Sequence, residues 1–224
     1  MIQIFRDITI HENDYVSIFE NDTLRFLKKL HDKFGTVISC YCFFRSGDFA
    51  LSQCTDKFRD EFMKNSDWLK FGFHAFDPET TYGNEYTGSI RDDYDSVIEN
   101  LISITGDTCI DSVIRLHYFA GSLSEIKSLT SSPLCPLRGL LCADDRRPSY
   151  YLTESQNEYI YSHDYFHDDI NGIDFYATDL RAEFIKSASK KISEFKSSSW
   201  NNQLGILTLF SHEWALNART KRVI

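Results

Sequence analysis

The sequence predicts an α/β protein built around a parallel β-sheet. Short apolar segments rich in β-branched and aromatic residues alternate along the chain with longer segments whose apolar residues recur at helical spacing. The 224 residues lie within the range of one α/β domain. The 10 glycines and 4 prolines are too sparse to mark a linker. We therefore expect a single domain over residues 1–224, with its strands running in the same direction.

The first half of the chain is expected to hold four strands, each an apolar run with β-branched or aromatic residues. They cover residues 2–8, 36–44, 68–73 and 112–116. Helical segments separate them and cover residues 20–34, 57–64 and 92–106. Gly35 and Gly106 stand at the ends of two of these segments, where glycine commonly terminates a helix.

The second half of the chain is expected to continue this alternation less regularly. Ser122 and Glu125 have the spacing of a capping box, so a helix should begin after Ser122. Further strands are expected at residues 137–143, 174–177 and 204–210. Residues 150–161 are expected to form a hairpin or meander, and residues 178–195 are expected to form the longest helix.

Net charge and composition narrow the classes of partner. The formal net charge is −9, whereas a protein that follows a nucleic-acid backbone normally carries a basic patch. Nucleic acid is therefore not an expected partner. The 18 phenylalanines and 12 tyrosines can supply a substantial core, so a disordered chain is not expected.

The cysteine pattern and the apolar runs predict a cytoplasmic protein. The six cysteines include no Cys-x-x-Cys pair, which argues against a thiolate zinc site or a thioredoxin-like site. The N-terminal segment lacks the features of a secretory signal, and no apolar run approaches the roughly 20 residues that a membrane-spanning helix needs. We therefore expect reduced thiols, a cytoplasmic location and no membrane span.

Polar side chains recur where the expected strands end. Three histidines and three aspartates directly follow apolar runs, namely His74, His117, His212, Asp7, Asp144 and Asp145. The carboxyl ends of parallel strands meet on one face of an α/β fold and carry its function. Imidazole and carboxylate groups are also suitable ligands for zinc or another divalent first-row ion. The sequence therefore predicts a polar, metal-binding site at these strand ends.

Each of these residues also has a purely structural explanation. A single histidine after an apolar run is more often a hydrogen-bonded, partly buried residue than a ligand. Asp7 could form a salt bridge with Arg6 or Arg115, and residues 144–147 could form a solvated polar loop.

The sequence also contains a second histidine cluster and lacks several common catalytic motifs. His163 and His167 have the spacing of two ligands on one helical face, although residues 168–172 beside them resemble a surface turn. The chain has no G-x-G-x-x-G, Walker, G-x-S-x-G or H-E-x-x-H motif. Cys109 has no histidine near it in the sequence, so nucleophilic cysteine catalysis is not expected.

The order of four short motifs gives the chain a family resemblance. They are Phe5-Arg6-Asp7, the strand that leads to His74, the pair Arg115 and Tyr118, and the late segment "LGILTLFSH" at residues 204–212. In this order the chain resembles the polysaccharide deacetylase (NodB-homology) superfamily, and most of all its divergent members linked to bacterial surface-polysaccharide biosynthesis. The resemblance implies a distorted (β/α) barrel of about seven parallel strands. It also implies removal of N- or O-acetyl groups from sugars with a bound divalent metal, commonly zinc.

The resemblance also assigns roles to residues. The family's first motif has two aspartates where this chain has Asp7 alone, and its second motif has two histidines where this chain has only His74. We expect His117 to replace the missing histidine, so the metal ligands are Asp7, His74 and His117. His212 would be the general acid, because histidine changes protonation near neutral pH.

The remaining roles are those of the general base and of the substrate-binding residues. Asp77 and Asp144 are both candidates for the general base. The residues expected to contact the substrate are Arg115, Tyr118 and Trp214. Arg115 could orient a carboxylate through two hydrogen bonds, and the two aromatic rings could stack on sugar faces. Ordinary packing is the alternative for each of them.

Two functions are therefore expected. The first is a metal-dependent hydrolase that removes an acetyl group from a sugar or a related acylated substrate, with polysaccharide-biosynthesis enzymes as partners. The alternative is a catalytically inactive deacetylase-like barrel that binds carbohydrate or acts as a scaffold in polysaccharide biosynthesis. The missing aspartate and histidine favour this alternative, whereas the position of His117 favours the enzyme.

Overall fold

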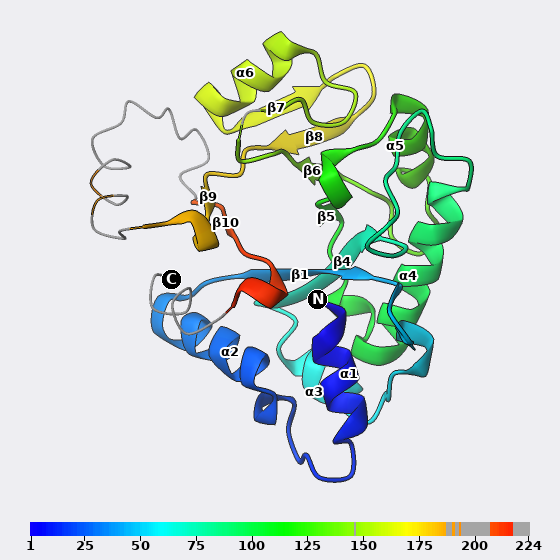
Figure 1. The fold of residues 1–224 in the computed structure, drawn as a ribbon, viewed down its shortest axis with the longest axis vertical. Helices are drawn as coiled ribbons and strands as arrows, with labels where there is room; N and C mark the ends of the chain where they lie inside the picture. Colours follow the sequence, from blue (N-terminus) through cyan, green and yellow to red (C-terminus); the bar gives the residue numbers. More distant parts are fainter. Residues whose placement is uncertain (146, 187–189, 191–192, 194–206, 217–224) are drawn as a thin grey trace. The chain divides into compact units, whose positions relative to one another are not determined.

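The computed structural model describes residues 1–145, 147–186, 190, 193 and 207–216. The chain divides into two compact units, residues 1–137 and residues 138–224 (Figure 1). Both units are mixed α/β. None of the helices within the described ranges has both the length and the apolar character needed to cross a membrane.

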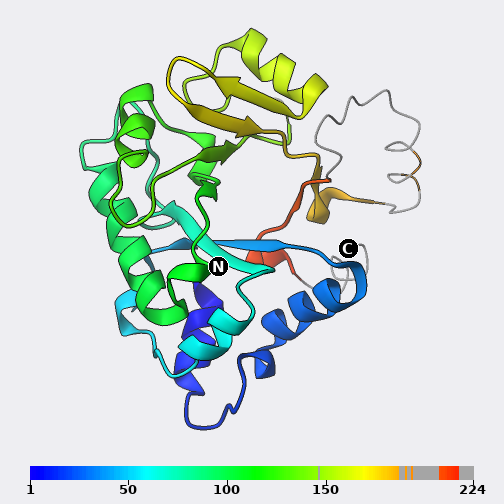
Figure 2. The ribbon, with the colours of Figure 1, turned by 180° about the vertical axis from the view of Figure 1, so that it is seen from behind.

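The first unit combines helices with short strands. Its α-helices are α1 (Ile2–Ile10), α2 (Asp22–Phe34), α3 (Arg59–Lys64), α4 (Ile90–Thr105) and α5 (Leu123–Leu129). Its strands are β1 (Ile38–Phe43), β2 (Arg45–Ser46), β3 (Phe49–Ala50), β4 (Leu69–Ala75) and β5 (Val113–Ile114). Its 3₁₀ turns are η1 (Ile18–Glu20), η2 (Leu51–Gln53), η3 (Asp107–Cys109) and η4 (His117–Phe119). Figure 2 shows α1, α2 and α3 beneath the pair formed by β1 and β4.

The second unit contains one described α-helix and several short strands. The helix is α6 (Glu154–His163). The strands are β6 (Gly139–Leu141), β7 (Tyr165–Asp168), β8 (Ile173–Tyr176), β9 (Leu180–Arg181) and β10 (Leu209–Phe210). The 3₁₀ turns are η5 (Ala182–Phe184) and η6 (Glu213–Ala215). Strand β8 pairs with β6 in parallel and with β7 in antiparallel orientation, while β9 and β10 form a separate parallel pair.

The predicted (β/α) barrel of seven parallel strands is wrong. Strands β1 and β4 pair in parallel, but the hairpins β2–β3 and β7–β8 are antiparallel. Outside β1 and β4, the described strands are only two to four residues long. A barrel needs a closed ring of hydrogen-bonded strands, and such short, separately paired strands do not form one.

Residues 2–8 are predicted to be a strand and instead lie in helix α1. The alternating isoleucines look like a strand pattern, but the helix buries Ile2, Ile4, Phe5 and Ile8 and exposes Ile10. Buried positions spaced three and four residues apart form one helical stripe. The packing of that stripe into the core therefore outweighs the β-propensity of isoleucine.

The core of the first unit forms around alternate residues of β4. The Phe71 ring contacts Phe5 of α1 and Phe62 of α3, with ring centroids 5.2 Å and 5.4 Å away. Two residues on, the Phe73 ring lies 5.3 Å from that of Tyr94 on α4. Because successive side chains of a strand point to opposite faces, this arrangement turns position 74 away from the phenylalanines.

Two predictions for the second unit are wrong in the described residues. Residues 150–161 are expected to form a hairpin or meander, but helix α6 begins at Glu154. A capping box starts it, in which Thr153 and Gln156 bond each other's backbone amides. The helix expected over residues 178–195 begins instead as strand β9 and turn η5. The rest of that segment lies largely outside the described residues.

Several other local predictions are confirmed. The strands expected at residues 36–44 and 68–73 correspond to β1 and β4. The helix expected at residues 92–106 corresponds to α4, which ends at Gly106, and α5 begins with the expected capping box. Strand β10 lies within the segment expected at 204–210, which is described from residue 207.

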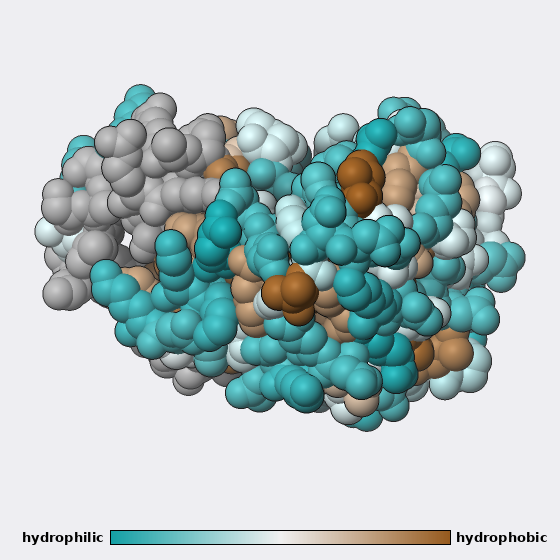
Figure 3. Space-filling view, turned by 90° about the horizontal axis from the view of Figure 1, so that it is seen from below, coloured by the Kyte–Doolittle hydropathy of each residue, from teal (hydrophilic) through white to brown (hydrophobic). Residues whose placement is uncertain are grey.

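Apolar side chains on the surface are mostly scattered. The face drawn in Figure 3 is largely hydrophilic, with isolated apolar residues among the polar ones. Val16, Ile170 and Trp214 are the most exposed of the large hydrophobic side chains among the described residues, at 89%, 91% and 78%. Single exposed apolar residues are normal on protein surfaces, so exposure alone does not mark a site.

The packing of α1 predicts the effect of two substitutions on one helix. Phe5→Ala should lower the free energy of unfolding by about 3–5 kcal/mol, because it removes a ring buried against two others. Ile10→Ala, at a position that is 65% exposed, should change it by no more than about 0.5 kcal/mol. Urea unfolding measures both. Equal losses in the two variants would contradict the helical face described for α1.

Candidate functional site

His74 occupies an irregular position in the first unit's parallel pair. Cys42 pairs with Phe73 and Phe43 pairs with Ala75, so the register skips His74. Such bulges re-aim a side chain and are common beside active sites. The His74 ring is buried, and its Nδ1 lies 2.6 Å from the carbonyl oxygen of Arg115. Burial, reinforced by the Arg115 guanidinium, holds the pKa of His74 well below its usual range.

His117 lies beside His74 to form what we call the imidazole pair. The two ring centroids are 5.1 Å apart, and the Phe43 ring lies 5.0 Å from one and 5.3 Å from the other. His117 Nδ1 lies 3.0 Å from the carbonyl oxygen of Thr80. The structure therefore brings together two of the three predicted metal ligands.

The hydrogen bonds of the imidazole pair define its chemistry. A carbonyl oxygen can only accept, so each Nδ1 carries the hydrogen and donates it. In the neutral ring Nε2 then carries the lone pair. Histidines that bind metal ions almost always have their other ring nitrogen held by such an acceptor. The pair therefore has the donor chemistry of two imidazole ligands for a divalent ion.

Asp7, the third predicted ligand, has other partners. It lies on α1, where its Oδ2 accepts hydrogen bonds from the Tyr15 hydroxyl at 3.1 Å and from the Asn21 amide at 2.7 Å. His11 Nε2 lies 3.8 Å from its other oxygen. Across the part of the chain that the structure describes, no group of three or more His, Cys, Asp or Glu side chains is arranged to hold a metal ion.

The backbone directly after His117 adopts an unusual conformation. Tyr118 and Phe119 have φ angles of 56° and 57°, in the left-handed region that bulky side chains seldom occupy. The Tyr118 ring stays 57% exposed, with its centroid 4.0 Å from that of His117. Arg115 is buried, with its guanidinium carbon 4.6 Å from the Phe119 ring centre. Strained residues of this kind cluster at binding and catalytic sites.

Asp77 holds the loop that carries the acceptor of His117. Its carboxylate accepts hydrogen bonds from Arg45 at 2.8 Å and 3.1 Å and from the Thr80 hydroxyl at 2.7 Å. Burial raises the pKa of Asp77, but the hydrogen bonds from Thr80 and Arg45 outweigh burial and leave it below its usual value. The carboxylate therefore stays ionised, which suits the anchoring of this loop.

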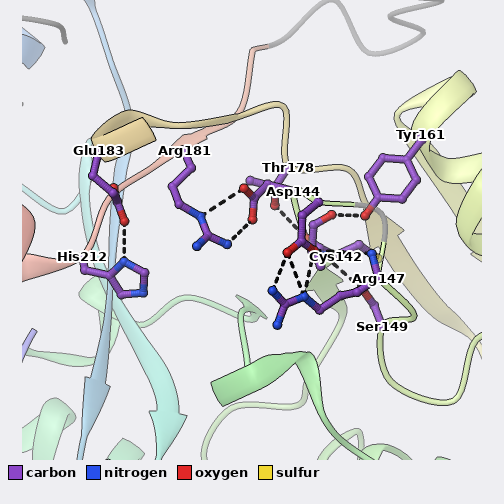
Figure 4. A network of polar contacts seen from close by, with 11 residues as sticks. Cys142, Asp144, Arg147, Ser149, Tyr161, Thr178, Arg181, Glu183 and His212 are labelled. Atoms are coloured by element: carbon purple, nitrogen blue, oxygen red, sulfur yellow. Dashed lines mark hydrogen bonds and ion pairs between the residues drawn. The ribbon is translucent and has the colours of Figure 1, made fainter. Parts of the chain in front are cut away.

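In the second unit, the register of a parallel pair places a carboxylate opposite His212. Phe210 of β10 pairs with Arg181 of β9. Glu183 and His212 come two residues after the last residue of β9 and of β10, and they lie side by side. His212 Nδ1 and Glu183 Oε1 are 2.5 Å apart, and Figure 4 shows the imidazole beneath the carboxylate. We call this pair the dyad.

The dyad leaves one nitrogen of His212 available for chemistry. Its Nδ1 hydrogen goes to Glu183, and the His212 side chain is 32% exposed while that of Glu183 is only 10% exposed. A carboxylate that holds Nδ1 fixes the orientation of the ring, so that Nε2 is the nitrogen that can transfer a proton. The exposed Trp214 ring stacks on His212 with centroids 5.3 Å apart, so an aromatic surface lies beside that group.

Asp144 is bound by an arginine. Arg181 donates from Nη2 to Asp144 Oδ1 at 2.5 Å and from Nε to Oδ2 at 3.0 Å, as Figure 4 shows. The two side chains are only 14% and 9% exposed. The neighbouring Asp145 forms a more exposed pair with Arg147. Both aspartates that follow β6 are therefore held in ion pairs.

The second histidine cluster does not lie on one helix. His163 ends α6, and its Nδ1 lies 3.0 Å from the carbonyl oxygen of Tyr159. His167 lies on β7, opposite Asp174 of β8, with Nδ1 and Oδ1 2.7 Å apart. The Asp174 carboxylate raises the pKa of His167. The two histidines thus belong to different elements.

Two acidic residues of the second unit are absent from the predicted site. Glu183 completes the dyad, and its Oε2 is buried without a hydrogen-bond partner among the described residues. Asp179 accepts a hydrogen bond from the Thr208 amide at 2.7 Å, and burial raises its pKa to about 6. In the sequence both lie in the segment interpreted as a helix. Their positions beside His212 and Thr208 become visible only once β9 and β10 are paired.

Comparison of the chain with protein-family models, with curated proteins and with solved structures finds no match in any of the three.

The environment of Asp179 predicts a pH-dependent stability. Its pKa is raised in the folded protein, so the unfolded chain releases this proton first, and the protein loses stability as pH rises from about 4 to about 6. Asp179→Asn keeps the acceptor for Thr208 but cannot ionise. The free energy of unfolding of the variant, minus that of the natural protein, should be about 1 kcal/mol larger at pH 7.5 than at pH 4.5. This value allows for the partial exposure of Asp179.

Urea unfolding at the two pH values measures this difference. Asp169→Asn is the control, because the Asp169 side chain is 94% exposed. A gain of the same size at both pH values would contradict the assigned cause.

Proposed function

We propose that this protein is a hydrolase that removes an acyl group, such as acetyl, from a sugar or a related acylated substrate. The observation that carries the proposal is the dyad, in which Glu183 holds Nδ1 of a partly exposed His212. Histidine oriented by a carboxylate is a common means of proton transfer in hydrolysis. The order of motifs that resembles polysaccharide deacetylases supports the same class of substrate.

In the proposed reaction, His212 acts as the general acid. Water adds to the acyl carbon, and the Nε2 hydrogen passes to the sugar oxygen or nitrogen as the bond from that atom to the acyl carbon breaks. The products are the free sugar hydroxyl or amine and the carboxylic acid. Glu183 orients the imidazole for this transfer, because its carboxylate accepts the Nδ1 hydrogen. The exposed Trp214 ring, stacked on His212, offers an apolar face on which a sugar ring can lie.

Metal dependence forms a separate part of the proposal. The imidazole pair supplies two nitrogen ligands whose Nδ1 hydrogens are already held by backbone carbonyls. Independently of the dyad, a divalent ion held there would supply Lewis-acid chemistry. The two imidazoles fit such an ion by donor type, whereas Asp7 is held by Tyr15 and Asn21.

A second candidate function is carbohydrate binding without turnover. Both predicted general bases are held in ion pairs, Asp77 with Arg45 and Asp144 with Arg181. The hydrogen bonds of Asp77 hold its pKa below the usual value, which makes it a poor proton acceptor. Trp214 would still bind a sugar face in a protein that performs no chemistry.

Substitutions in the dyad test the hydrolase. His212→Gln should lower kcat/KM for acetate release from N- or O-acetylated sugar oligomers by about 10²- to 10⁴-fold, because it removes the proton donor. Glu183→Gln should lower it by about 10- to 100-fold, because it disturbs the orientation of the ring.

The matched control for these variants is a second histidine–carboxylate pair in the same unit. His167 and Asp174 have similar geometry on the β7–β8 hairpin, so His167→Gln should leave turnover unchanged. Full activity in His212→Gln would refute the proposal. Sugar binding without acetate release by the natural protein would support the second candidate.

Metal content after purification in metal-replete buffer tests the imidazole pair. His74→Ala and His117→Ala should each weaken zinc binding by at least about 10-fold, measured by titration with the metal alone. Asp7→Ala and the control His11→Ala should leave it unchanged, since Asp7 bonds Tyr15 and Asn21. Loss of zinc in Asp7→Ala would instead support the three-ligand set predicted from the sequence.

A further inference from the structure

The Arg181 guanidinium contacts three side chains of the second unit. Its two hydrogen bonds to Asp144 are bidentate, at 2.5 Å and 3.0 Å. Its guanidinium carbon also lies 4.7 Å from the Phe184 ring centre and 4.9 Å from the Phe210 ring centre. The guanidinium therefore packs against two aromatic rings while the carboxylate fixes its plane.

These two rings belong to the two chain segments that form the dyad. Phe184 directly follows Glu183, and Phe210 lies two residues before His212. Backbone pairing between β9 and β10 extends over only two residues of each strand. So short a pairing is a weak constraint on the side chains that follow it. The stacked guanidinium adds a second connection between the two segments.

We propose that Arg181, oriented by Asp144, is the positioning residue of the His212–Glu183 dyad. It acts through Phe184 and Phe210 and does not contact the reacting atoms. The effect of Arg181 on catalysis rests on the proposed hydrolase function. Its effect on the geometry of the dyad is independent of that function. In this account Asp144 anchors the arginine and does not act as the general base that the sequence suggests.

The chemistry of arginine explains why this position needs that residue. A guanidinium is planar, stacks on aromatic faces and matches a carboxylate with two parallel hydrogen bonds. A lysine ammonium keeps the charge but offers neither the plane nor the fork. Arg181→Lys therefore removes the stacking while the charge on Asp144 stays balanced.

The test follows the Nδ1 hydrogen of His212 directly by NMR. In the full chain labelled with ¹⁵N-histidine, a hydrogen-bonded Nδ1–H is protected from exchange with water and gives a resonance, which His212→Gln identifies by its loss. Arg181→Lys and Asp144→Asn should each broaden or abolish this resonance. Arg147→Lys, in the exposed pair with Asp145 of the same unit, is the matched control and should leave it intact.

The resonance of His167, which bonds Asp174 on the β7–β8 hairpin, reports whether each variant is folded. Loss of the His212 resonance with retention of that of His167 supports the proposal. An unchanged His212 resonance in Arg181→Lys overturns it. If Arg181→Lys loses both the His212 and the His167 resonances, Phe184→Leu provides the test instead. It removes one exposed ring and keeps the ion pair between Arg181 and Asp144. Weakening of the His212 resonance there supports the proposal, and no change overturns it.

Acetate release separates this inference from the proposed function. In an active enzyme, Arg181→Lys should lower kcat by about 10-fold or more with KM within about 2-fold, because ring orientation matters in the transition state more than in binding. Loss of the His212 resonance in a protein that releases no acetate in any form would support the positioning role and refute the hydrolase.

Discussion

The alternation of side chains along β4 is the constraint on which the first unit depends. Phe71 and Phe73 enter the core between α1, α3 and α4, while the residue after them must turn the other way. A slip of one residue would exchange His74 with the phenylalanines and place an imidazole in the apolar core. The burial of two large rings therefore also fixes where His74 lies.

The histidines of both units are oriented in the same manner. His74 and His117 donate Nδ1 hydrogens to backbone carbonyls, and His212 donates its own to a carboxylate. With Nδ1 protonated, Nε2 is the ring nitrogen that can transfer a proton or bind a metal ion. The acceptors differ in charge, however. Burial and the Arg115 guanidinium favour the neutral form of His74, which can act as a ligand, whereas the acceptor of His212 is a carboxylate.

Local patterns in the sequence were reliable where one signal dominated. The apolar run of β4, the glycine at the end of α4 and the capping box of α5 each depend on neighbours a few residues away. The predictions were wrong where two signals competed. In α1 the alternating isoleucines mimic a strand, and in α6 the tyrosines between residues 150 and 161 mask a capping box. The barrel was wrong because closure depends on pairing between distant strands, which no local pattern encodes.

By itself, the sequence determined which residues carry reactive groups and that His74 lies at the end of a buried strand. It also suggested that His117 would lie beside His74, and the two ring centroids are 5.1 Å apart. Only the tertiary structure decided that Asp7 bonds Tyr15 and Asn21, and that Glu183 holds His212. The physical reason is that these partners are set by helix packing and strand register. A spacing of 29 residues between Glu183 and His212 has no meaning until β9 and β10 pair.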